Sequence, residues 1–185
     1  MNIFALDHCP EESAKQLCDI HLSKMLVESC QLLATCFSLE RLAQEDCPRT
    51  QSGNKRKHFN PKHPSALWVR ESTANMDWLI LHTLAMEDER LERGMNPHFC
   101  VGFLHWVILN IDDAIIPEGK LTEFKVAINE KQNCRTVEGF EAYSPTTKYK
   151  LYYLLDKPFA KWTKNKPNWM QWTPQKIAKT FELCV

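Results

Sequence analysis

Hydrophobic side chains in residues 10–38 recur on nearly every side of a helical wheel. Leu22, Leu26 and Leu33 share one side, and the other sides carry further leucine, isoleucine, valine and methionine residues. A helix that is apolar nearly all round is buried in the core of a protein. Pro10 suits the first helical position, because the N–H that proline lacks would have no partner there. The pattern predicts one long, buried helix over residues 10–38.

Four further helices are expected along the chain. They are predicted over residues 64–93, 97–110 and 145–155, and from residue 174 onward. Gly94 is a suitable stop for the second of them, because glycine adopts the left-handed conformation that commonly ends a helix. Residues 46–63 have the composition of a loop, whereas residues 122–128 fit a short helix or a strand. The sequence therefore predicts an all-α fold: a compact single domain of residues 1–185 built around two long buried helices.

The composition excludes several classes of protein. Of the 185 residues, 44% are hydrophobic and 25% are charged, so neither a disordered chain nor a collagen-like repeat is expected. No apolar run approaches the ~18 residues of a membrane span, and the N-terminal segment lacks the pattern of a secretory signal. The eight cysteines show no C-x-x-C spacing, which favours free thiols over metal ligands. We expect a cytoplasmic monomer that binds no membrane, no metal and no cofactor.

The net charge of zero hides two basic segments. Residues 48–70 hold six basic residues and no acid, and residues 142–185 hold eight lysines against two acids. Most of the first group lies in residues 46–63, here called the basic loop. Two such segments can form a face that binds a polyanion, and the absence of acids from residues 48–70 favours nucleic acid. The C-terminal lysines fit an ordinary solvated surface equally well. The residues expected to contact the DNA backbone are Lys55, Arg56, Lys57, Lys62, Lys164 and Lys166.

Three titratable residues interrupt the apolar surface of the first predicted helix. His21, Lys24 and Glu28 are spaced so that they share one stripe. Charges in a buried helix are costly unless they are paired or functional. Because acid–base chemistry needs different titratable groups close together, we favour a catalytic site formed by these three residues. The structural alternative is a buried pair of Lys24 and Glu28 beside a packed histidine.

Candidate substrate-binding residues lie around the start of the second predicted helix. His63 and Ser65 flank its first residue, where free backbone N–H groups favour an anion such as phosphate. Arg70 lies close to that end. Glu71 and Asn75 share a stripe further along the helix, and they fit a substrate site or a buried polar network equally well.

The C-terminal segment adds further candidates, because its lysines alternate with aromatic residues. Lys161, Trp162 and Trp169 are the residues expected to bind substrate there. Cations for phosphate and flat rings for stacking are typical of a groove that holds exposed bases. The alternative is that the tryptophans anchor the segment on the core.

Three motifs carry a resemblance to known proteins. They are the opening M-N-I-F, the pattern D-x-H-x-x-K-x-x-x-E from Asp19 to Glu28, and H-P-S-x-x-W-x-R-E-S from His63 to Ser72. With them the chain resembles a family of small phage proteins and, more distantly, the phage pyrimidine-dimer DNA glycosylases of the endonuclease V type. In those glycosylases a histidine precedes the catalytic glutamate by seven residues, the spacing of His21 and Glu28.

The resemblance implies a compact all-α fold of the endonuclease V type, DNA as the partner, and the cytoplasm of a phage host as the compartment. It implies a DNA glycosylase of the kind used in DNA repair, acting on a damaged or modified base flipped from the duplex. Glu28 would stabilise the cationic transition state while an amine attacks the sugar C1′. Those glycosylases use the α-amine of a small residue exposed by removal of methionine. Asn2 is bulky, so we expect Met1 to stay in place.

Several alternatives remain open at this point. The nucleophile is the α-amine of Met1, the amine of Lys24, or a water activated by Glu28, and base release is expected more firmly than lyase cleavage of the strand. A DNA-base hypermodification transferase, which attaches an amine or amino acid to an activated pyrimidine, would need the same pocket and basic groove. A non-catalytic DNA-binding protein that blocks host defence would need only the basic groove and not the pocket.

Overall fold

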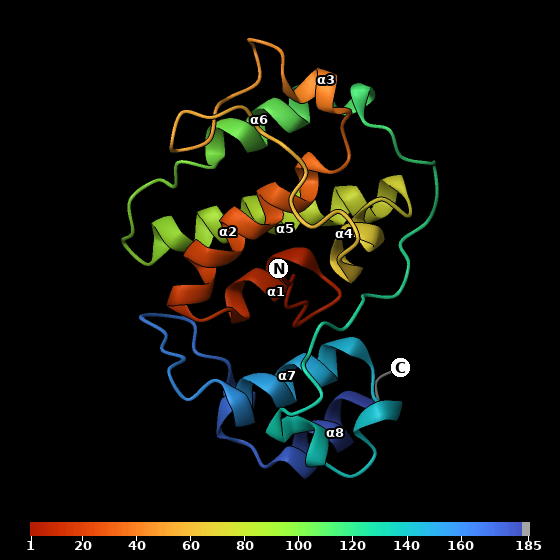
Figure 1. Ribbon diagram of the computed structural model, residues 1–185. Helices are drawn as coiled ribbons and strands as arrows, with labels where there is room; N and C mark the ends of the chain where they lie inside the picture. The colour runs from red at the N-terminus through yellow and green to blue at the C-terminus, as the bar shows by residue number, and fades with distance from the viewer. Residues whose placement is uncertain (183–185) are drawn as a thin grey trace.

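The computed structural model describes residues 1–182 and consists of helices and connecting segments (Figure 1). Within these residues there are eight α-helices, four short 3-10 helices and no strand, so the all-α prediction is confirmed. The α-helices are α1 (Pro10–Gln16), α2 (Asp19–Ala34), α3 (Leu39–Leu42), α4 (Pro64–Val69), α5 (Thr73–Glu92), α6 (Val101–Leu109), α7 (Pro145–Asp156) and α8 (Pro174–Glu182). No helix in this part of the chain is long and apolar enough to cross a membrane.

The prediction of one helix over residues 10–38 is wrong, because α1 and α2 are separate helices. Leu17 and Cys18 lie between them in extended conformations, with ψ of 142° and 160°. The backbone groups freed by this break find partners elsewhere in the fold. The N–H of Asp19 donates to the carbonyl of Lys161 at 2.9 Å, and the guanidinium of Arg93 donates to the carbonyl of Leu17 at 3.0 Å. Tertiary hydrogen bonds therefore stabilise a break that the apolar pattern does not reveal.

The second predicted helix is also divided, into α4 and α5. Ser72 has an extended backbone between them, and its Oγ accepts a hydrogen bond from the N–H of Asn75 at 3.2 Å. This N-terminal cap starts α5 as a new helix. α5 ends where predicted, with Gly94 in the left-handed region at φ 79°. α7 and α8 begin at the predicted prolines, α6 begins only at Val101, and residues 122–128 form neither a helix nor a strand.

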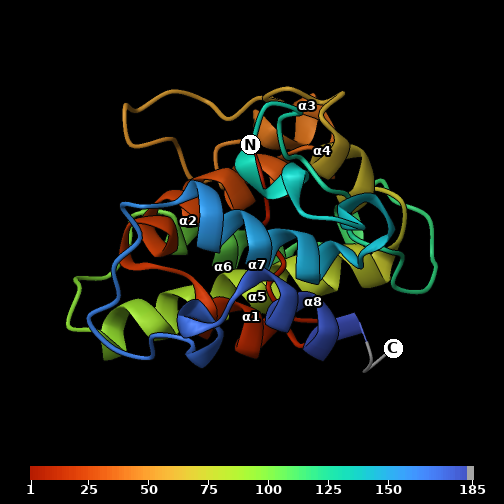
Figure 2. The ribbon, with the colours of Figure 1, turned by 90° about the horizontal axis from the view of Figure 1, so that it is seen from below.

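The N-terminal segment runs through the middle of the molecule, as Figure 1 shows. Residues 2–6 are all buried, and their side chains alternate between two hydrophobic clusters. Ile3 and Ala5 belong to the cluster built from α2, α4, α5 and α6. Phe4 and Leu6 belong to the cluster that contains residues of α1, α7 and α8. Figure 2, seen from below, places α7 and α8 in front of the other helices, so the segment lies where the two layers meet.

The cysteines in residues 1–182 are free thiols, as expected, and all except Cys9 are buried. Cys184 lies outside the described residues. No group of three or more histidine, cysteine or acidic side chains suited to a metal ion occurs in this part of the chain.

Candidate functional site

Glu28 lies beside the N-terminal amine, although the two are far apart in the sequence. Its side chain, on α2, is only 15% exposed, and Oε2 lies 3.9 Å from the amine nitrogen of Met1. The same oxygen accepts a hydrogen bond from the backbone N–H of Asn2 at 2.7 Å. The other carboxylate oxygen lies 3.7 Å from Nζ of Lys24, whose side chain is 63% exposed. The Lys24–Glu28 pair of the structural alternative is therefore present, but it is not buried, because Lys24 faces solvent.

His63 completes this arrangement. It is the N-cap of α4, and its Nδ1 accepts a hydrogen bond from the N–H of Ser65 at 3.2 Å. Burial lowers the pKa of the His63 imidazole, the positive charge of the Met1 amine lowers it further, and the Glu28 carboxylate opposes both effects. All three groups are thus close enough to interact electrostatically. We call Met1, Glu28 and His63 the amine site.

The amine is held in place by the buried side chain of Asn2. Asn2 Oδ1 accepts hydrogen bonds from the N–H of Ile3 at 2.8 Å and from the hydroxyl of Tyr149 at 2.7 Å, while Nδ2 donates to the carbonyl of Ala127 at 2.9 Å. These three hydrogen bonds engage both ends of the Asn2 side-chain amide, and they therefore hold in place the residue that follows Met1. No pattern in the sequence indicates that Tyr149, in α7, helps to position the N-terminus, because 147 residues separate it from Asn2.

His21 occupies a different environment from Glu28. Its side chain is buried, its Nδ1 is hydrogen-bonded to the hydroxyl of Tyr153, and its ring stacks on Phe4 with centroids 4.7 Å apart. Burial, with smaller contributions from Lys157 and Lys24, lowers the pKa of His21 to about 4. A histidine that stays neutral in an aromatic environment fits the packed-histidine alternative. The stripe of three titratable groups therefore divides into a buried histidine, a nearly buried carboxylate and an exposed lysine.

The two polar residues at the start of α5 form a network with the segment after α6. Asn75 is fully buried, and its Nδ2 donates to the carbonyl of Trp68 at 2.7 Å and to Oγ1 of Thr122 at 2.8 Å. Glu71 accepts a hydrogen bond from the hydroxyl of Thr122 at 2.8 Å and lies 3.5 Å from Nζ of Lys125. These contacts favour the buried polar network for Asn75, whereas Glu71 is exposed and joins the same network at the surface.

Arg70 and Ser65 also lie near the start of α4. The Nε of Arg70 donates to the carbonyl of Ala66 at 2.9 Å, and its guanidinium also donates to the carbonyl of Pro61. Arg70 therefore fastens the end of the basic loop to α4. The hydroxyl of Ser65 is buried and has no hydrogen-bond partner among the described residues.

The two C-terminal tryptophans anchor their segment on α1. The indole N–H of Trp162 donates to the carbonyl of Gln16 at 3.1 Å, and that of Trp169 donates to the side chain of the same residue at 2.7 Å. Trp169 is buried and Trp162 is half-buried. Lys161 is exposed, and its carbonyl pairs with the N–H of Asp19 at the start of α2. Anchoring therefore accounts for both tryptophans.

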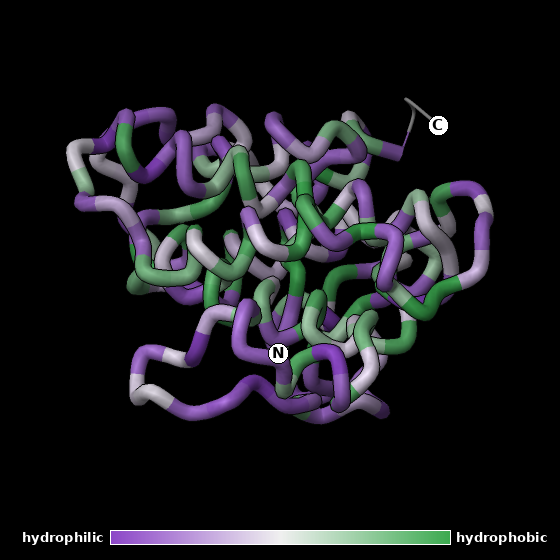
Figure 3. The backbone as a smooth tube through the Cα atoms, turned by 90° about the horizontal axis from the view of Figure 1, so that it is seen from above, coloured by the Kyte–Doolittle hydropathy of each residue, from purple (hydrophilic) through white to green (hydrophobic). Residues whose placement is uncertain are grey.

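The basic residues fall in two regions. In Figure 1 the basic loop lies above α2, whereas residues 157–173 lie below α1. Figure 3 shows the basic loop as a largely hydrophilic stretch on the side where the N-terminus lies. Lys55, Lys57, Lys62, Lys164 and Lys166 are exposed. Arg56 is half-buried, with its guanidinium 3.7 Å from the ring centroid of Phe103.

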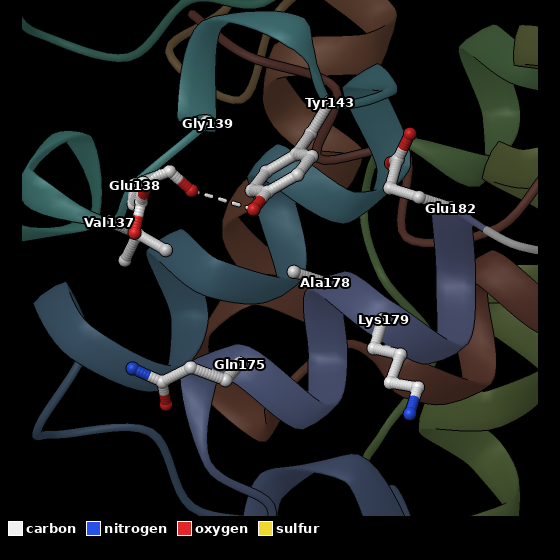
Figure 4. A pocket seen from close by; sticks show the side chains of 8 residues that line it. All are labelled: Val137, Glu138, Gly139, Tyr143, Gln175, Ala178, Lys179 and Glu182. Carbon is white, nitrogen blue, oxygen red and sulfur yellow. Dashed lines mark hydrogen bonds between the residues drawn. The ribbon is translucent and has the colours of Figure 1, made fainter.

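The largest cavity described for residues 1–182 lies away from the amine site. It has a volume of about 630 Å³ and lies between α8 and residues 137–143 (Figure 4). Its lining includes Tyr143, whose hydroxyl donates to the carbonyl of Glu138 at 2.6 Å. None of the site residues predicted from the sequence lines it. Two smaller hollows lie instead between the basic loop and α2.

Comparison with known proteins supplies one match. Residues 1–100 match the family model described as pyrimidine dimer DNA glycosylase. This range contains α1, α2, α4 and α5, and therefore all three residues of the amine site. No curated protein and no solved structure gives a significant match to the chain.

Proposed function

Because the chain belongs to the pyrimidine dimer DNA glycosylase family, we propose that it is a DNA glycosylase that releases a damaged or modified base from DNA. The observation that carries this proposal is the amine site, where an amine, a nearly buried carboxylate and an imidazole converge. A glycosylase that forms a covalent intermediate needs a nucleophilic amine at the sugar and a negative charge beside it.

The three groups have distinct parts in the proposed reaction. The Met1 ammonium first loses a proton to solvent, and the neutral amine then attacks C1′ of the deoxyribose. The glycosidic bond breaks, and its electron pair leaves with the base. Glu28 stabilises the positive charge that develops on the sugar, and the low exposure of its side chain makes this interaction stronger than it would be in water. We assign to His63, whose pKa is lowered mainly by burial, the role of accepting the proton that the amine must lose after its attack.

Among the possible nucleophiles, the geometry favours the Met1 amine over that of Lys24. The Met1 amine is fixed by the buried Asn2, whereas Lys24 ends in an exposed and flexible side chain. Fixing a nucleophile removes much of the entropic cost of reaching the transition state. Lys24, which lies on the opposite side of the carboxylate, is better placed to bind a phosphate.

A trapping experiment tests the proposal. The protein is incubated with a duplex that contains a single cyclobutane pyrimidine dimer, with and without sodium borohydride. Without reductant we expect the glycosidic bond of one pyrimidine of the dimer to break, which leaves an alkali-labile abasic sugar while the base stays joined to its partner pyrimidine. With reductant we expect a covalent protein–DNA adduct, with mass spectrometry placing the adduct on the peptide that contains Met1. An adduct on Lys24 would contradict the assigned nucleophile, and the absence of glycosidic cleavage in any damaged duplex would contradict the glycosylase proposal.

A further inference from the structure

A groove separates the basic loop from the exposed side of α2. One part, of about 480 Å³, is lined by residues that include Val27 and Gln31 of α2, and a second part, of about 560 Å³, includes Gln31 and Phe59. Gln31 follows Glu28 by three positions on the same helix, so the groove begins one helical turn from the amine site. Volumes of this size are typical of sites for small flat molecules.

Phe59 lines this groove with a ring that is 46% exposed. Single exposed aromatic residues are common, so exposure alone says little. Here, however, the backbone on both sides of the ring is fastened. His58 hydrogen-bonds to the carbonyl of Phe37 at 2.8 Å, and Arg56 donates to the carbonyl of Pro48 at 2.9 Å while it packs on Phe103. On the other side, Arg70 donates to the carbonyl of Pro61. The loop therefore presents the ring from a fixed position.

The charges around the Phe59 ring indicate which kind of ligand it contacts. Lys55, Lys57 and Lys62 are exposed within four residues of Phe59, and no acid occurs between residues 48 and 70. His63 of the amine site follows Phe59 by four residues. A rigid aromatic ring inside a cationic loop combines a surface for stacking with contacts for phosphates, which is the usual composition of a site for an unpaired nucleotide.

We propose that Phe59 stacks against a nucleobase of the DNA whose base pair is opened at the amine site, while Lys55, Lys57 and Lys62 contact the neighbouring phosphates. The inference rests on the proposed function, since it needs DNA to be bound and opened beside Met1. It adds a stacking residue that neither acid–base chemistry nor the motifs of the sequence assign.

A double-mutant cycle on binding tests the stacking. Affinity for a duplex with one pyrimidine dimer is measured for the wild type, for Phe59→Ala and for Phe59→Trp. Each protein is also measured on duplexes in which one nucleotide near the dimer, on either strand, is abasic. We expect Phe59→Ala to weaken binding of the duplex without an abasic site about tenfold, which lies within the range measured for one base–aromatic stack. Phe59→Trp should restore the affinity, and at one abasic position the penalty of Phe59→Ala should disappear.

A matched control separates stacking from general loss of apolar surface. Leu67, on α4, is 48% exposed and does not line the groove, so Leu67→Ala should leave affinity within about twofold. A Phe59→Ala penalty that persists at every abasic position, or no penalty at all, would overturn the inference. The experiment measures affinity and not glycosidic cleavage, so it tests the two proposals separately. If the Phe59→Ala penalty disappears at one abasic position but the protein cleaves no glycosidic bond, the stacking inference is supported and the glycosylase proposal is contradicted.

Discussion

Replacing Glu28 by glutamine removes one charge from the amine site and changes the shape of the side chain little. The carboxylate oxygen lies 3.9 Å from the Met1 amine and the side chain is 15% exposed. At that distance the attraction to a full positive charge is about 4 kcal/mol for an effective dielectric constant of about 20. A transition state that carries most of a charge therefore loses about 3–4 kcal/mol, which corresponds to a rate that falls by about two to three orders of magnitude.

The fold should tolerate this change. The amide oxygen of glutamine can accept the N–H of Asn2, and Lys24 is exposed, so the charge of Lys24 is not buried without a partner. The Met1 amine loses its counter-charge but keeps a polar amide beside it. We expect the free energy of unfolding to change by about 1 kcal/mol or less. DNA affinity should stay the same or rise slightly, because a negative charge leaves the DNA-binding side.

The assay is glycosidic cleavage under single-turnover conditions, read as alkali-labile abasic sites, with enzyme in excess over a duplex that contains one dimer. Thermal unfolding is measured on the same samples. Glu12→Gln serves as the control, since Glu12 pairs with Lys15 on the exposed surface of α1. A folded Glu28→Gln protein whose rate stays within about threefold of the wild type would refute the catalytic role. A protein that melts far lower but keeps its specific activity in the cold would assign Glu28 to the structure instead.

Four further predictions concern binding and stability. DNA affinity should fall with salt at a log–log slope of roughly −5 if about six phosphates are contacted, and titrations at several salt concentrations would expose a flat response. Activity should survive EDTA, and restoration by added zinc or magnesium after a loss would contradict this. Burial lowers the pKa of His21 and of His82 to about 4, so only the unfolded chain binds these protons between pH ~6.5 and ~4. Stability should fall as pH falls through that window, by about 3 kcal/mol per histidine, and denaturant titrations of His82→Gln should show a smaller loss. Burial likewise lowers the pKa of Lys150 to about 8, so the stability of the wild type relative to that of Lys150→Met should rise from pH 8 to 10.

The sequence predicts most of the helices but not where the long ones break. One break carries a local signal, because Ser72 is a good N-cap and could have been recognised as the start of α5. The break at Leu17 and Cys18 carries none, since Cys18 makes no side-chain cap and the freed groups pair with Lys161 and Arg93. Such partners are supplied by the tertiary fold, which local patterns do not encode.

The candidate site divides in a similar way. The sequence predicts Glu28 and the Met1 amine as candidates for one reaction, whereas it predicts His63 only as a substrate-binding residue. Their convergence depends on the N-terminal segment passing between the two hydrophobic clusters. His21 illustrates the opposite case, because helical spacing placed it with Glu28 while packing against Phe4 and Tyr153 placed it in the interior.

The path of the first six residues also determines when, during synthesis on the ribosome, the amine site can exist. The residues that position the amine emerge first, but two of their anchors emerge among the last: Tyr149, which binds Asn2, and Lys150, which binds the carbonyl of Leu6. At translation rates of about 5–20 residues per second, the N-terminus waits roughly 7–30 seconds for these partners. A nascent chain therefore carries Glu28 and His63 early, yet its N-terminal amine has no fixed position until α7 has left the ribosome.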